Sequence, residues 1–267
     1  MTCAEPFVDI HCHLIPGIDD GSQSWEQSRA MAEMARADGV GTIVATPHQL
    51  GNYSHNHGRD VRNNTAELQR QLDQHAIDLQ VLPGADVRIE DSMIERLRSG
   101  EVLTLADQGR HVLLELPHEL YFPLEPVLQQ LHRADMVGIL SHPERNQGLL
   151  KQPRLIPQLI AAGCLMQVTC GSLMGTFGSP SQKMAEHLLE QGWVHFLASD
   201  AHGPNARRPL MKRAWERVAK RVGTDMADRL CCQNPARVVA GQDVAPKNHR
   251  KKTALLMSGW FRRQQAA

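Results

Sequence analysis

Histidines and carboxylates gather in short motifs along this chain, in types and spacings that suit metal ions. The first motif, VDIHCHLIPGIDDG, covers residues 8–21 and carries two histidines at alternate positions followed by two aspartates. Residues two apart on a strand point to the same side, so His11 and His13 could reach one ion together. Asp200 and His202 repeat that spacing near the other end of the chain.

Nine side chains in all are candidate metal ligands. Carboxylates that converge repel one another and lose hydration unless a cation lies among them. Imidazole and carboxylate ligands without thiolates suit manganese, zinc or iron. One ion takes only about four to six ligands, so the set predicts two or three ions. The candidates are His11, His13, Asp20, His48, Asp86, Glu115, His142, Asp200 and His202.

These candidates follow short apolar runs that predict β-strands. The predicted strands are 7–11, 41–46, 79–84, 111–116, 136–141, 164–169 and 194–199. Helical patterns lie between them, most clearly at 22–39, 62–76, 181–192 and 207–223. Strands that alternate with helices pair in parallel through crossover connections. A closed or nearly closed (β/α) barrel fits this pattern best, and it would bring the carboxyl ends of all strands to one face.

A doubly wound sheet is the alternative architecture. It is less favoured because no glycine-rich dinucleotide loop follows the first predicted strand. The chain has 267 residues, of which 42% are hydrophobic, and this is typical of a globular protein. Its 29 basic and 29 acidic residues balance, so the overall charge does not favour nucleic-acid binding.

Cysteine usage and the N-terminal sequence predict a reduced, cytoplasmic protein. The six cysteines show no metal-binding spacing, and the start of the chain lacks a signal-peptide pattern. Residues 246–267 form a basic tail without an acidic residue. That tail has two interpretations: a solvated end, or a short amphipathic segment that contacts anionic lipid or an acidic partner.

Five motifs resemble the PHP (polymerase and histidinol phosphatase) family of metal-dependent phosphoesterases. They are DIHCHLIPGIDDG, IVATPH, SHPERN, QVTCGSLMGTFG and HFLASDAHGPNARRP. More narrowly, they are similar to the bacterial protein-tyrosine phosphatase branch associated with capsule and exopolysaccharide synthesis. The resemblance implies a distorted (β/α)7 TIM-like barrel of the PHP type at residues 1–245, with 246–267 as an appended tail. It also implies a phosphotyrosine protein as substrate, such as the tail of a bacterial tyrosine kinase. The basic tail lies outside the resemblance, and its amphipathic interpretation predicts contact with the inner face of the membrane.

The resemblance further implies how three metal ions, manganese first with iron and zinc as alternatives, divide the ligands. His11, His13 and Asp200 would hold the first ion, Glu115 and His142 the second, and Asp20, His48 and His202 the third. Asp86 would bridge the first two ions. Arg145, with Arg207 or Arg208, would bind phosphate, and Asp200 or His202 could assist by proton transfer.

Position 86 departs from the family pattern, which usually has glutamate there. The side chain of Asp86 is shorter by about 1.5 Å. We therefore expect the loop to move inward, a water molecule to intervene, or metal affinity to fall.

Three rival functions remain. The segment CCQNPAR, from Cys231 to Arg237, contains the C-x5-R spacing of cysteine-dependent phosphatases. It is disfavoured because Pro235 has no backbone N–H to offer a phosphate and because the segment follows a helical pattern. The other rivals keep the metals: a small-molecule phosphomonoesterase of the histidinol-phosphatase kind, or a non-catalytic metal-bound scaffold.

Overall fold

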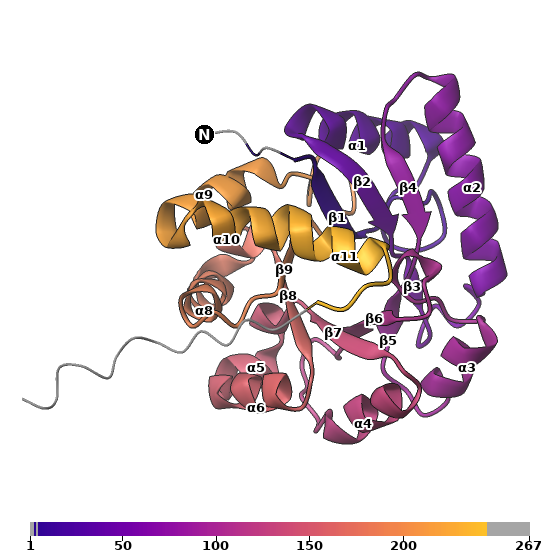
Figure 1. Ribbon diagram of the computed structural model, residues 1–267. Coiled ribbons are helices and arrows are strands. Elements are labelled where there is room, and N and C mark those ends of the chain that lie inside the picture. The colour runs from indigo at the N-terminus through magenta and orange to yellow at the C-terminus, as the bar shows by residue number, and fades with distance from the viewer. Residues whose placement is uncertain (1–2, 4, 245–267) are drawn as a thin grey trace, which may run out of the picture.

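Helices surround a ring of parallel strands in this computed structural model, which describes residue 3 and residues 5–244 (Figure 1). The predicted basic tail at 246–267 lies outside the described residues, so its role stays a prediction. Within the described residues, none of the helices combines the length and apolar character needed to cross a bilayer.

Two parallel sheets make up the ring. The first sheet contains β1 (Phe7–Cys12), β2 (Val40–Ala45) and β4 (Gln80–Pro83) in that order. The second contains β3 (His48–Gln49), β5 (Asp86–Arg88), β6 (His111–Glu115), β7 (Val137–Ser141), β8 (Leu165–Thr169) and β9 (Phe196–Ala198). Each predicted strand is present, and the predicted strands 41–46 and 79–84 continue after a break into β3 and β5.

A proline and a closely packed glycine lie at the two breaks. Pro47, between β2 and β3, has no N–H with which to continue a ladder. Gly84, between β4 and β5, lies so close to Val44 that an added Cβ would stand 2.6 Å from its Cγ1. Because β2–β3 and β4–β5 are each one interrupted stretch of chain, they join the two sheets into one distorted wall.

The first and last strands also meet. Cys12, at the end of β1, forms a parallel bridge with Ala201, just beyond β9. The Asp200 N–H donates to the His11 carbonyl at 2.7 Å, and the His13 N–H donates to the Ala201 carbonyl at 2.9 Å. A doubly wound sheet has two open edges, so this contact favours a barrel-like arrangement of the parallel strands.

Eleven α-helices cover the described part of the ring. They are α1 (Trp25–Asp38), α2 (Gly58–Gln74), α3 (Met93–Ser99), α4 (Glu125–Arg133), α5 (Gln147–Lys151), α6 (Ile156–Ala161), α7 (Cys170–Leu173), α8 (Gly178–Glu190), α9 (Lys212–Val222), α10 (Thr224–Asp228) and α11 (Asn234–Val239). The α1 helix follows the prediction because Ser24 caps its start and Gly39, at φ 100°, ends it. The short helices α3 to α7 escaped prediction, since one or two turns give too few residues to show a period.

The interior of the barrel changes from apolar to polar along its strands. Leu113, Leu165 and Phe196 belong to one buried apolar cluster, which Val238 of α11 also joins. Residues two apart on a strand share a face, so Glu115 and Gln167 continue the inward faces of β6 and β8 beyond that cluster. An apolar layer therefore lies directly beneath the polar ends of the strands.

Candidate metal centre

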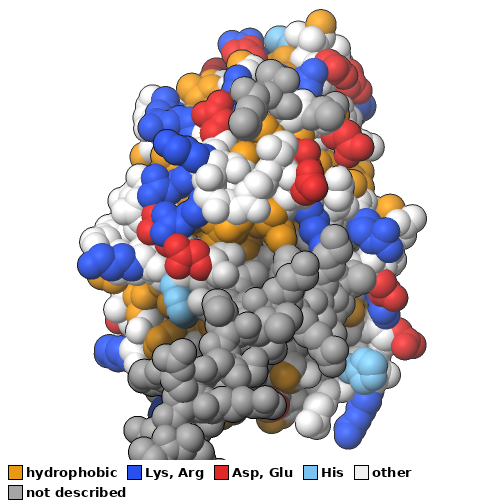
Figure 2. Space-filling view, turned by 60° about the vertical axis from the view of Figure 1, so that its left-hand side comes forward, with side chains coloured by type: hydrophobic (Ala, Val, Ile, Leu, Met, Phe, Trp, Pro, Cys, Tyr) orange, Lys and Arg blue, Asp and Glu red, His pale blue; other side chains and the backbone are white. Residues whose placement is uncertain are grey.

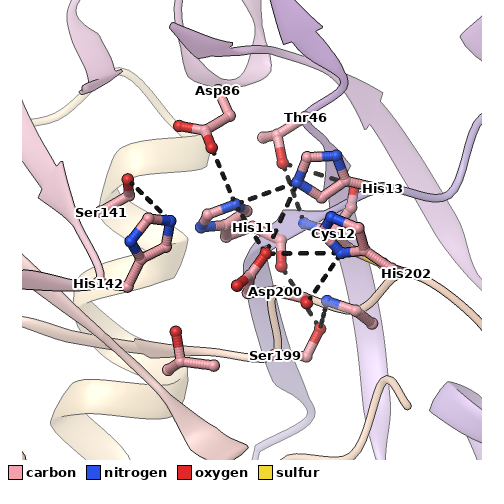
Figure 3. A network of polar contacts seen from close by, with 12 residues as sticks. His11, Cys12, His13, Thr46, Asp86, Ser141, His142, Ser199, Asp200 and His202 are labelled. Carbon is pink, nitrogen blue, oxygen red and sulfur yellow. Dashed lines mark hydrogen bonds and ion pairs between the residues drawn. The ribbon is translucent and has the colours of Figure 1, made fainter. Parts of the chain in front are cut away.

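The candidate ligands lie in compact groups at the carboxyl ends of the strands. Figure 3 shows His11, His13, Asp86, His142, Asp200 and His202. His11 lies near the end of β1 and His13 follows the strand directly, and their Nε2 atoms are 3.3 Å apart. His11 Nε2 lies 3.2 Å from Asp200 Oδ1 and 3.4 Å from Asp86 Oδ2. His13 Nε2 lies 3.7 Å from Asp200 Oδ1. Four side chains from three separate regions of the chain thus point at one small volume.

Three of these four separations, 3.2 to 3.4 Å, are those of ligand atoms around a shared ion. Two atoms that are each about 2.1 Å from one ion lie about 3.0 to 3.4 Å apart in octahedral or tetrahedral geometry. The two Nε2 atoms face each other, and both also face Asp200 Oδ1. These three atoms cannot all be satisfied by hydrogen bonds with one another. The donor set therefore fits a divalent metal ion.

A second layer of side chains fixes how the two imidazoles are protonated. His11 Nδ1 donates to Gln167 Oε1 at 2.9 Å, and His13 Nδ1 donates to Asp19 Oδ2 at 2.7 Å. In a neutral imidazole the other nitrogen then keeps its lone pair, so both Nε2 atoms present lone pairs to the centre. Asp19, the neighbour of the predicted ligand Asp20, acts here as a positioning residue.

A further group forms at the outer side of the centre. Asp20 Oδ1 lies 3.4 Å from His48 Nε2 and 3.4 Å from His202 Nε2. His202 Nδ1 donates to the Asp200 backbone carbonyl at 3.1 Å, which leaves the Nε2 lone pair for a ligand. The three residues expected to share an ion lie together, and His13 belongs to the same compact group.

Glu115 and His142 are placed apart from each other. Glu115 Oε2 lies 3.6 Å from His48 Nδ1 and groups with His48 and Asp86. His142 groups with His11 and Asp200. Among the described residues no compact group holds both Glu115 and His142, although the resemblance assigns them to one ion.

Asp86 reaches the centre despite its short side chain. It is fully buried, and its Oδ2 lies 3.4 Å from His11 Nε2 and 3.6 Å from His48 Nδ1. Its backbone is brought inward because β5 pairs with β3, with Asp86 opposite His48. Neither carboxylate oxygen has a hydrogen-bond partner. A buried carboxylate without hydrogen bonds is costly, so this position also fits a cation.

The electrostatics point the same way. Burial alone lowers the pKa of His11, but Asp200 and Asp86 raise it to about 9. Burial likewise opposes protonation of His48, but Asp20 and Asp86 raise its pKa to about 10. Burial, and then Asp86, raises the pKa of Glu115 to about 7. The carboxylates give the cluster an excess of negative charge. Protons on the imidazoles balance that charge, and metal ions could balance it in their place.

Two arginines complete the centre. Arg145 and Arg207 both donate to Asp200 Oδ2, the latter at 2.6 Å. The Arg145 guanidinium also lies 4.1 Å from the ring centroid of Phe177. Arg208, which sequence reasoning could not separate from Arg207, is exposed and forms no ion pair with any described residue.

The backbone is strained where these groups are held. His142, Asp200 and Arg207 have φ values of 33°, 51° and 49°, in the left-handed region that non-glycine residues avoid. Each costs about 1 kcal/mol or more, and such strain concentrates at functional sites.

The comparisons agree with this geometry. Residues 7–240 match the family described as "Capsular polysaccharide synthesis, CpsB/CapC". The chain belongs to the CpsB/CapC family. It is 33% identical over 221 residues to the tyrosine-protein phosphatase YwqE of Bacillus subtilis, covering 82% of this chain and 86% of that protein. It is 29% identical over 241 residues to the tyrosine-protein phosphatase CpsB of Streptococcus pneumoniae, covering 88% and 99%.

Solved structures extend the comparison. A structure from work on YwqE and CpsB, described there as unique metal-dependent tyrosine phosphatases, matches with a TM-score of 0.85 and 31% identity, over 89% of this chain and 96% of that one. A phosphotriesterase homology protein from Escherichia coli, at 10% identity and a TM-score of 0.58, shares the fold alone. The predicted resemblance to the capsule-associated phosphatase branch is confirmed.

In this CpsB/CapC family member, several supporting residues lie outside the set of candidate ligands that the sequence predicts. Asp9 accepts from the Ser199 backbone N–H at 3.0 Å and so ties β1 to the segment that carries Asp200. Glu144 accepts from the Thr169 N–H at 3.0 Å and from Ser172 Oγ at 2.6 Å. Of these residues, Gln167 has the clearest signal in the sequence, because an amide inside an apolar strand run is unusual.

The cysteine-based rival does not fit the structure of this family member. Cys231 is fully buried, and burial raises the pKa of its thiol well above the usual range. It lies in a helical turn, Arg229–Gln233, that runs into α11. A nucleophilic cysteine needs an accessible thiolate, so Cys231 is a packing residue.

Proposed function

We propose that this protein is a metal-dependent phosphatase that removes phosphate from tyrosine residues of proteins. The observation that carries the proposal is the convergence of buried imidazoles and carboxylates, including Asp86, whose oxygens accept no hydrogen bond, beside two arginines. The CpsB and YwqE relatives, named tyrosine-protein phosphatases, support the choice of phosphotyrosine.

We propose that two or three ions bind here, with manganese first and iron or zinc as alternatives. His11, His13, Asp86 and Asp200 would hold one ion. Asp20, His48 and His202 would hold another, and Glu115 and His142 would complete the set through Asp86 and Asp200. Such ions supply Lewis acidity to phosphoryl oxygens and lower the pKa of water.

The residues of the chain bind and orient the phosphate. Arg145 and Arg207 can each present two N–H groups to phosphate oxygens, which a lysine cannot match. Asp200 holds both guanidinium groups near the centre, and Phe177 packs against Arg145. The Nδ1 proton of His202 is held by the Asp200 backbone carbonyl, so its Nε2 would offer a lone pair to an ion rather than a proton to the departing phenolate oxygen.

The biological setting is also part of the proposal. We take residues 1–245 as one catalytic domain and 246–267 as a tail. The natural substrate would be a bacterial tyrosine kinase that controls capsule or exopolysaccharide synthesis, in line with the family description. Six unpaired cysteines support action in the reducing cytoplasm. Contact with the inner face of the membrane through the tail stays a prediction.

Hydrolysis of a phosphotyrosine peptide and of p-nitrophenyl phosphate, each with and without EDTA, tests the proposal. We expect EDTA to abolish both activities, Mn²⁺ to restore them, and thiol alkylation to leave them unchanged. Metal-dependent activity on the small ester but not on the peptide would move the substrate to a small phosphate monoester. Metal binding without hydrolysis of either would favour the scaffold function.

A further inference from the structure

A cavity lies beside the metal centre, and the two share one arginine. Its volume is about 490 Å³, and its walls come from the α7 region and from the loop between β9 and α9. Arg207, which donates to Asp200 in the centre, is also part of the cavity wall. Phe177 lines the cavity while its ring contacts Arg145. A substrate group that leaves the metal centre on this side must therefore pass the cavity.

The cavity is positively charged. Arg207, Arg208 and Arg213 line it, and no acidic residue does so in the part of the chain that the structure describes. Arg208 and Arg213 are exposed, and neither forms an ion pair with any described residue. Their charges are thus available to a ligand.

Two other arginines of α9 form ion pairs with acidic residues. Further along α9, Arg217 pairs with Glu186 of α8, and Arg221 pairs with Glu190 of α8 at 2.6 Å. Figure 2 brings forward the side of the molecule where α8 and α9 lie, and blue and red side chains are mixed there. Arg213, at the end of α9 that faces the cavity, has no acidic partner among the described residues.

The positive charge comes from side chains rather than from the helix end. The Met211 and Lys212 N–H groups at the start of α9 already donate to Asp38 Oδ2, at 2.6 and 2.8 Å. Met174 and Leu210 add apolar wall beside the arginines. This combination suits a carboxylate on a short alkyl stem, because the stem can pack while the charge meets guanidinium.

We propose that this arginine cavity binds an acidic side chain that flanks the phosphotyrosine of the protein substrate. The proposal rests on the proposed phosphatase function, and it assigns Arg208 and Arg213 to substrate choice rather than to catalysis. An aspartate or glutamate near the phosphotyrosine would then lower KM. The phosphoryl group would still bind at the metal centre, with or without that acidic residue.

Two peptides that differ only in charge test the cavity. One carries aspartate or glutamate on both sides of phosphotyrosine, and the other carries asparagine or glutamine there. The variant is Arg213→Gln, and the matched control is Lys220→Gln, an exposed residue two turns further along α9 and outside the cavity. All proteins are assayed with Mn²⁺ on both peptides and on p-nitrophenyl phosphate.

We expect the parent protein to prefer the acidic peptide by about three- to tenfold in kcat/KM, chiefly through KM. Arg213→Gln should remove most of that preference, and Lys220→Gln should keep it. Activity on p-nitrophenyl phosphate should stay within about twofold in both variants. The preference should shrink at about 1 M salt, where the Debye length is about 3 Å.

Equal use of the two peptides by the parent would overturn the proposal, as would an equal effect of Arg213→Gln and Lys220→Gln. These results differ from failure of the proposed function, in which neither peptide is hydrolysed in an EDTA-sensitive way. An Arg213→Gln protein that loses p-nitrophenyl phosphate hydrolysis as well would also contradict a role limited to substrate choice.

Discussion

Substitution of Gly21 by alanine should disable the centre through a steric contact. Gly21 follows the candidate ligand Asp20, and its N–H donates to Asp19 Oδ1 at 2.9 Å. A Cβ at this position would stand 2.4 Å from both the Cβ and the carbonyl oxygen of His13. Ordinary carbon contacts begin near about 3.4 Å, so His13 and the turn must separate by about 1 Å.

That displacement falls on a candidate ligand and on the residue that orients it. A misplacement of about 1 Å at a catalytic centre costs about 100-fold in rate, which is about 2.7 kcal/mol of transition-state stabilisation. Overpacking should also lower the free energy of unfolding by about 1 to 3 kcal/mol. We therefore expect Gly21→Ala to remain folded but to lose about 100-fold in kcat/KM and to bind less metal.

Gly203→Ala is the matched control. Gly203 follows the candidate ligand His202, as Gly21 follows Asp20, but an added Cβ would meet only the Ala206 carbonyl at 3.5 Å. We expect activity within about threefold of the parent. The assays are kcat/KM on p-nitrophenyl phosphate with Mn²⁺, metal content of the purified protein, and Tm. Parent-like activity of Gly21→Ala, or an equal loss in Gly203→Ala, would refute the steric argument.

Further predictions concern the metal, the positioning acid, the rival thiol and pH. Chelation should lower Tm, since ions at 100 times their Kd stabilise by about 2.7 kcal/mol, and Asp86→Asn should remove most of this Tm shift. Asp19→Asn should reduce activity by about 10- to 100-fold, with partial recovery at high Mn²⁺, because the His13 tautomer is no longer imposed. Cys231→Ser should keep activity within about twofold, and a larger loss in folded protein would revive the thiol mechanism. Burial lowers the pKa of His111 to about 4. Below about pH 6.5 the imidazole therefore takes up a proton in the unfolded chain, whereas in the folded protein it stays neutral down to about pH 4. Stability should therefore fall by up to about 3 kcal/mol from pH 6.5 to 4, and His111→Phe should flatten that part of the Tm profile.

The strand order and the convergence of the candidate side chains could be predicted because both depend on local patterns. A buried parallel strand appears in the sequence as an apolar run. The residue after it lies at the carboxyl end of the sheet, whichever position the strand takes in the sheet. The two-residue spacing of His11 and His13 places both imidazoles on one side for the same reason. Chain order alone was therefore enough to predict a barrel with a metal centre at one face.

Only the tertiary structure separated Arg207 from Arg208. Adjacent residues point in different directions, and the left-handed φ of Arg207, 49°, is imposed by a loop whose two ends are held by the His202 N–H to Arg207 carbonyl bond at 2.9 Å. The reach of Asp86 likewise depends on the broken strand that pairs it with His48. No local pattern contains either fact.

The sequence by itself determined which residues could bind metal, since side-chain chemistry and strand periodicity are local properties. The tertiary structure decided how those residues are grouped, that Asp86 lies within 3.4 Å of His11, and that Gln167 and Asp19 hold the two imidazoles. His11 and Gln167 are 156 residues apart along the chain. Contacts of that kind depend on barrel closure and on packing to within about an ångström, which no short stretch of sequence specifies.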